Sequence, residues 1–61
     1  MKTIKQILIE RDGIEPSEAD EMIEAARTEL IELIEAGEFM AADEICYNHF
    51  GLEPDYLEEL L

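Results

Sequence analysis

Hydrophobic residues recur along this chain with the period of an α-helix, and no segment alternates for long enough to form a strand. The clearest stretch is 16–36, where an arc of about 120° on the helical wheel is apolar, the width expected of a helix packed on a core. Its apolar positions are Ala19, Ile23, Ala26, Leu30 and Leu33, with Met22 and Ile34 widening the stripe. The pattern predicts a long amphipathic helix and an all-α fold.

Three shorter helices are predicted around it, at about 4–12, 39–50 and 54–61. Thr3 and Gln6 have the spacing of a capping box at the start of the first. Its inner face holds Ile4, Ile7 and Leu8. The inner face of the third is broad and comprises Phe39, Ala41, Ala42, Ile45, Cys46, His49 and Phe50. The last helix begins at Pro54 and is short, so we expect it to fray. Residues 1–61 are expected to form one domain, a compact bundle of three to four short helices.

One internal similarity links the two ends of the chain. Gly13-Ile14-Glu15-Pro16 and Gly51-Leu52-Glu53-Pro54 share Gly, Glu and Pro at an offset of 38 residues. In each unit Gly suits a left-handed helix end and Pro suits the first turn of the next helix. The repeat predicts two helix–turn–helix units, and both duplication and independent use of a good helix stop and start explain it.

Charge limits the kinds of partner. The 61 residues carry 17 Asp and Glu against 4 Lys and Arg, a formal net charge of −13. This charge repels nucleic acids and anionic lipid, so we expect neither nucleic-acid nor membrane binding and favour a basic protein as partner. No signal peptide or apolar span is visible, and one cysteine is typical of a reducing compartment, so a cytoplasmic location is expected.

Catalytic and metal-binding patterns are sparse. Cys46 and His49 are three residues apart and share a helix face, so they could form a nucleophile or half of a metal site. Each is the only residue of its type, and both lie on the predicted apolar face. Core packing is therefore the favoured interpretation, and we expect no cofactor, no metal and no enzyme activity.

Apolar residues that the wheels place outside the core suggest a contact surface. Ile31 falls among acids on the second helix, Met40 and Tyr47 on the outer side of the third, and Ile9 on the back of the first. An apolar anchor surrounded by acids can recognise a basic partner, because charge speeds encounter and the anchor supplies affinity. The expected partner-binding residues are Glu21, Glu24, Ile31, Glu32 and Glu35. Met40, Tyr47 and Ile9 are expected to form a second contact or a homodimer face, or to complete the core.

The run Ile9-Glu10-Arg11-Asp12-Gly13-Ile14, the Glu- and Ala-rich second helix and the ending His49–Leu57 resemble small acidic helical proteins of bacteriophages and gut-associated mobile elements. That group has no assigned activity, so the resemblance implies no site residues. It implies a context in which proteins of this size and charge bind host or defence proteins, including anti-CRISPR and anti-restriction factors that imitate nucleic acid.

Two functions from different classes follow. The leading hypothesis is a non-enzymatic acidic module that binds a basic, nucleic-acid-handling host or defence protein and inhibits it by charge mimicry. The alternative is a structural or assembly component that acts through homo-oligomerisation. A metal-dependent activity at Cys46 and His49 is a distant third.

Overall fold

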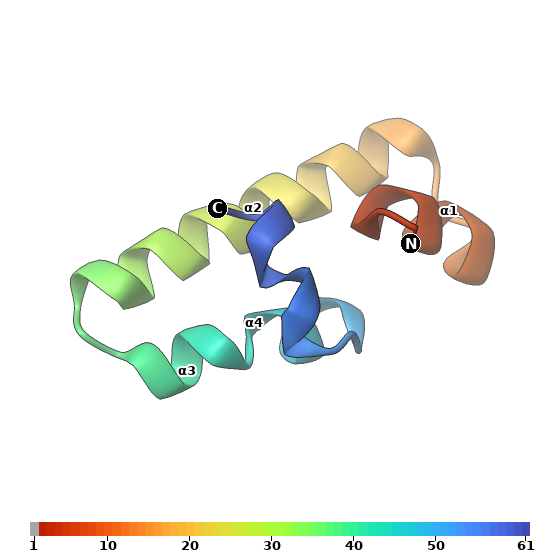
Figure 1. The fold of residues 1–61 in the computed structure, drawn as a ribbon. Helices are drawn as coiled ribbons and strands as arrows, with labels where there is room; N and C mark the ends of the chain where they lie inside the picture. The colour runs from red at the N-terminus through yellow and green to blue at the C-terminus, as the bar shows by residue number, and fades with distance from the viewer. Residues whose placement is uncertain (1) are drawn as a thin grey trace.

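The computed structural model describes residues 2–61 and places most of them in helices, with no strand among them. The elements in chain order are α1 (Ile4–Asp12), α2 (Pro16–Glu35), α3 (Phe39–Asp43), α4 (Ile45–Phe50) and the 3-10 helix η1 (Pro54–Glu59). Helices α3 and α4 run back along one side of α2, and η1 then brings the C-terminus beside the middle of α2 (Figure 1). The prediction of a small all-α bundle is confirmed.

Helix α1 begins with the predicted capping box. The Thr3 hydroxyl accepts the Gln6 backbone N–H at 3.2 Å, and the Gln6 side-chain carbonyl accepts the Thr3 N–H at 2.8 Å. A third free N–H of this turn, that of Ile4, donates to the Glu59 carboxylate at 3.1 Å. The start of α1 is thus tied to the end of the chain as well as to its own first turn.

The two Gly-containing connections have the same local structure. Gly13 and Gly51 both adopt a φ of +67°, and each donates its N–H to the carbonyl four residues earlier. The residue after each glycine, Ile14 or Leu52, reaches the carbonyl six residues back at 3.3 or 3.1 Å. The elements that follow differ, because the first connection opens a 20-residue α-helix and the second a six-residue 3-10 helix.

The expected third helix is wrong in one respect, because it is two helices that meet at Glu44. The Glu44 N–H bonds to the Ala41 carbonyl at 3.2 Å, a tight three-residue turn, and its own carbonyl starts α4 by accepting the Asn48 N–H at 2.9 Å. The buried face nevertheless continues across this turn, because Ala42 on α3 and Ile45, Cys46 and Phe50 on α4 all lie in the core. Phe39, expected inside, is 64% exposed.

The expected fraying of the last helix does not describe this structure either. The segment is a 3-10 helix, and Leu60 directly after it is only 1% exposed. The Arg27 guanidinium donates from Nε to the Leu60 carbonyl at 3.1 Å. Burial of one side chain and a hydrogen bond to α2 hold this segment in place.

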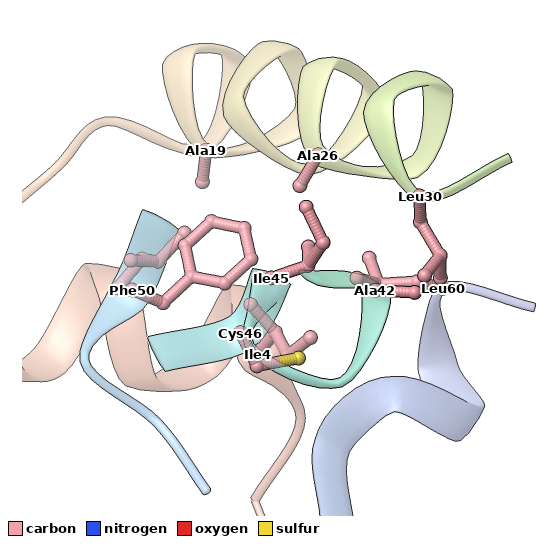
Figure 2. Close-up of a cluster of buried hydrophobic side chains, with 10 residues drawn as sticks. Ile4, Ala19, Ala26, Leu30, Ala42, Ile45, Cys46, Phe50 and Leu60 are labelled. Carbon is pink, nitrogen blue, oxygen red and sulfur yellow. The ribbon is translucent and has the colours of Figure 1, made fainter. Parts of the chain in front are cut away.

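The core lies between α2 and the four shorter segments. Figure 2 shows the short side chains of Ala19 and Ala26 on α2 opposite the larger Phe50 and Ile45. Small residues on one helix leave room for large residues on its neighbour, which keeps the packing dense. The buried set is Ile4, Leu8, Ala19, Ala26, Leu30, Ala42, Ile45, Cys46, Phe50 and Leu60. The predicted α2 stripe is therefore its core face, except that Ile34 is 39% exposed.

Candidate interaction surface

The outer side of α2 carries the predicted acidic residues. Glu21, Glu32 and Glu35 are exposed there, and so is Glu24. The Glu24 carboxylate forms an ion pair with Arg27 three residues later. Three of the four predicted glutamates are therefore free of ion pairs among residues 2–61, and the fourth is partly neutralised.

Every Lys and Arg side chain of the chain has an acidic partner. Lys2 pairs with Glu10 at 2.8 Å and Lys5 with Asp20 at 3.0 Å. The other pairs are Arg11 with Asp12, Arg27 with Glu24, and His49 with Glu29. Since these pairs use five of the 17 acids, the other twelve have no such partner within residues 2–61. The surface therefore presents a large excess of uncompensated carboxylates.

Arg11 also links the two Gly connections. Its guanidinium donates to the Phe50 carbonyl, the last of α4, at 2.6 Å while holding Asp12 at 2.9 Å. The hydrogen bond and charge of Arg11 lower the pKa of the Asp12 carboxyl, and Asp12 in turn raises the pKa of Arg11. The guanidinium of Arg11 is therefore used in contacts within the fold.

Three of the four apolar residues that were expected outside the core are exposed. Ile31, Met40 and Tyr47 are 45%, 85% and 70% exposed. Ile9 is half-buried and lies outside the core cluster, so it offers a partner less surface than the other three. Met40 lies on α3 and Tyr47 on α4, so the turn at Glu44 separates the two residues into different helices.

Tyr47 lines an open hollow of about 520 Å³ at the connection between α4 and η1. Its walls include Glu44, Asn48 and Leu52. The hollow is open to solvent, and three exposed acidic residues, Asp43, Glu44 and Glu53, line it together with Tyr47.

The structure has a second surface feature that the sequence pattern did not predict. Between α2, α3 and the end of the chain lies a groove of about 190 Å³, with Asp43 as its one charged lining residue. We call this the α2–α3 groove, lined by Leu30, Ile34, Phe39, Ala42, Leu57 and Leu61. Leu30 and Ala42 are core residues at its floor, while Phe39 and Leu61 are 64% and 79% exposed.

The signal for this groove was present in two adjacent apolar pairs. Neighbouring residues on an α-helix point about 100° apart, so a narrow inner face cannot bury both Phe39 and Met40. Leu60-Leu61, directly after η1, is a second adjacent pair of large apolar residues. In the second pair Leu60 is buried and Leu61 exposed, and in the first both are exposed. Which of these four side chains come together depends on how the helices pack on one another, and helical periodicity does not reveal that.

Cys46 and His49 are not brought together as a reactive pair. Cys46 is completely buried in the core, and burial, together with the charge of Glu59, raises the pKa of its thiol. The His49 ring extends instead to α2, where Nε2 lies 2.5 Å from the Glu29 carboxylate. Within residues 2–61 no group of three His, Cys, Asp or Glu side chains is arranged to hold a metal ion.

Across residues 2–61, none of the helices has the length and apolar character needed to cross a membrane. No protein-family model matches the chain, and no curated protein or solved structure is significantly similar to it.

Proposed function

We propose that this chain is a non-enzymatic interaction module that binds a basic protein through its acidic surface. In its sharpest form it occupies the nucleic-acid site of a host or defence protein and inhibits that protein by occlusion. The resemblance to phage proteins supports this setting, in the cytoplasm of the infected cell.

One observation carries the proposal, namely the charge of the second half of the chain. Residues 28–61 contain ten Asp and Glu and no Lys or Arg. Uncompensated carboxylates at this density raise the rate of encounter with a positively charged surface and disfavour acidic partners. On α2 the exposed Ile31 lies beside Glu32 and Glu35, which gives the charged surface an apolar contact.

The test is capture of a partner from bacterial lysate with the tagged protein and charge variants. Glu21→Gln/Glu32→Gln/Glu35→Gln removes three charges from the outer side of α2. Glu15→Gln/Glu44→Gln/Glu53→Gln removes the same charge elsewhere, at exposed glutamates whose side chains make no cap hydrogen bond. We expect one basic protein to be retained by the wild type and the second variant, and lost with the first variant and with Ile31→Asp.

Salt and activity complete this test. A charge-driven complex should be released by added NaCl, because exposed charges are screened. The captured protein's binding of nucleic acid should fall when this chain is added. Equal capture by both triple variants would mean that net charge alone collects basic proteins, and would contradict a specific surface on α2.

Self-association is the alternative function, favoured by the exposure of Met40 and Tyr47. An apolar oligomer holds or tightens as salt rises, whereas a charge-driven complex loosens. Sedimentation at low and high salt therefore separates the two, with Met40→Ser/Tyr47→Ser as the variant expected to dissociate an oligomer.

A further inference from the structure

The α2–α3 groove gathers exposed apolar side chains from segments that are distant in sequence. Ile34 from α2, Phe39 from α3 and Leu61 from the end of the chain all line it, although 27 positions separate the first and last of them. Each is more than one-third exposed. Apolar side chains gathered in this way on a small soluble domain are typical of an interaction site.

The chemistry of the groove limits the backbone of an occupant. Its lining is apolar apart from Asp43, so it supplies almost no partners for peptide N–H and C=O groups. Among residues 2–61 there is also no strand edge that an extended peptide could join. An occupant must therefore satisfy its own backbone hydrogen bonds, as a helix does.

The charge around the groove limits the side chains of an occupant. Asp43 lies in the lining, and Glu35, Glu38 and Glu58 directly adjoin lining residues in sequence and are exposed. No Lys or Arg occurs in residues 28–61 to balance them. A second copy of this chain would bring another net charge of −13 to the same place, which electrostatics disfavours.

We propose that the α2–α3 groove binds an amphipathic helix of a partner protein, with an apolar stripe in the groove and Lys or Arg along its flanks. This inference rests on the proposed function and gives the basic partner a structural form. Ile31 is three residues before Ile34, so the acidic side of α2 and the groove are adjacent on one helix. In this arrangement the groove, rather than Ile31 alone, provides the main apolar contact with the partner helix.

A synthetic peptide tests this directly. The probe is a fluorescein-labelled Lys/Leu helix of about 14 residues, or four turns, with Leu on one side. Its partner probe has the same composition in an order that abolishes the apolar stripe. Fluorescence anisotropy at physiological salt should show the amphipathic peptide binding about tenfold more tightly than the scrambled one.

Two neighbouring residues provide a matched pair of variants. Phe39→Ser removes a groove side chain, and Met40→Ser removes an exposed apolar side chain that does not line the groove. Since both are exposed, both variants should keep the helical circular dichroism spectrum. We expect Phe39→Ser to weaken peptide binding about tenfold and Met40→Ser to leave it within about twofold.

The other outcomes can be told apart, and the first three of them overturn the inference. Equal binding of both peptides, unaffected by Phe39→Ser, would mean that charge alone acts, and the proposed function would stand without the groove. If neither peptide binds while capture from lysate still depends on the α2 glutamates, the proposed function likewise stands without the groove. A wild-type dimer that Phe39→Ser dissociates would assign the groove to a second copy. If Phe39→Ser weakens peptide binding but Glu21→Gln/Glu32→Gln/Glu35→Gln does not, the groove is supported as the binding site. The proposed role of the α2 glutamates is then contradicted.

Discussion

At the scale of single residues, the two phenylalanines show how one residue type takes opposite roles. Phe50 is 3% exposed and lies opposite Ala19 in the core, whereas Phe39 lies largely in solvent at the groove. Their sequence neighbourhoods predict the same inner face for both. The difference comes from their places in the fold: Phe39 begins α3 at the open groove, whereas Phe50 ends α4 inside the core.

Substitution of the two should therefore have very different effects. Phe50→Ala should cost about 3–5 kcal/mol, because it leaves a cavity in the core. That is close to the whole stability of a chain of this size, at roughly 0.05–0.15 kcal/mol per residue. Phe39→Ala should change the free energy of unfolding by less than about 0.5 kcal/mol. Urea unfolding followed by circular dichroism measures both, and similar losses would contradict the burial described here.

Cys46 predicts a dependence of stability on pH. Its thiol pKa is raised in the folded protein, so the folded state holds the proton more tightly than the unfolded state. This contribution is complete below the unfolded thiol pKa of about 8.5 and is lost as pH rises through the folded value. Above about pH 8 the free energy of unfolding should therefore fall as pH rises, because the unfolded thiol loses its proton first.

Cys46→Ala is the control for that fall. The variant should be less stable overall, because it removes a buried side chain, but its stability should depend less on pH in this window. Urea midpoints at several pH values would show the difference. Parallel curves for the two proteins would mean that the thiol does not contribute.

At the scale of elements, the short 3-10 helix η1 has structural importance beyond its length. Glu59 caps α1, Leu60 enters the core, and the Leu60 carbonyl accepts the Arg27 guanidinium. A segment of six residues with poor intrinsic helix stability is thus held by contacts to two other helices.

Leu60 and Leu61 test this attachment as adjacent, chemically identical residues. Leu60→Ala should lower the free energy of unfolding by about 2–5 kcal/mol, since it empties a core position. Leu61→Ala should have an effect near zero on stability, because its side chain is 79% exposed. Thermal melts compare the two directly. If Leu60→Ala unfolded at the wild-type temperature, η1 would not be part of the cooperative fold.

At the scale of the whole molecule, net charge works against the compact state. A charge of −13 on 7.0 kDa produces self-repulsion, and only five acids have ion-pair partners within residues 2–61. The same excess gives the proposed surface its selectivity for basic partners. Stability and binding are thus coupled through one property of the sequence.

The melting temperature should accordingly rise with NaCl. From about 0.01 to 1 M, the Debye length falls from about 30 to 3 Å, which screens the repulsion. The rise should be smaller in Glu15→Gln/Glu44→Gln/Glu53→Gln, which carries three fewer charges. Circular dichroism melts across this range provide the measurement, and a flat or falling curve for the wild type would contradict the idea.

The sequence by itself determined the all-α class, the position of α2 and its core face, and the start of α1. These features depend on local periodicity, capping and glycine at left-handed helix ends, which act over a few residues. Composition alone gives the acidic character of the chain. The helical period also placed Ile31, Met40 and Tyr47 outside the core, and all three are exposed.

Only the tertiary structure decided the turn at Glu44, the exposure of Phe39, the half-burial of Ile9 and the docking of Leu60. The α2–α3 groove depends on all segments from α2 to the end of the chain, and its walls are assembled from residues distant in sequence. Helical periodicity shows which side chains share a face of one helix. It does not give the direction in which the chain leaves a turn, and that direction decides which apolar faces meet and which stay open.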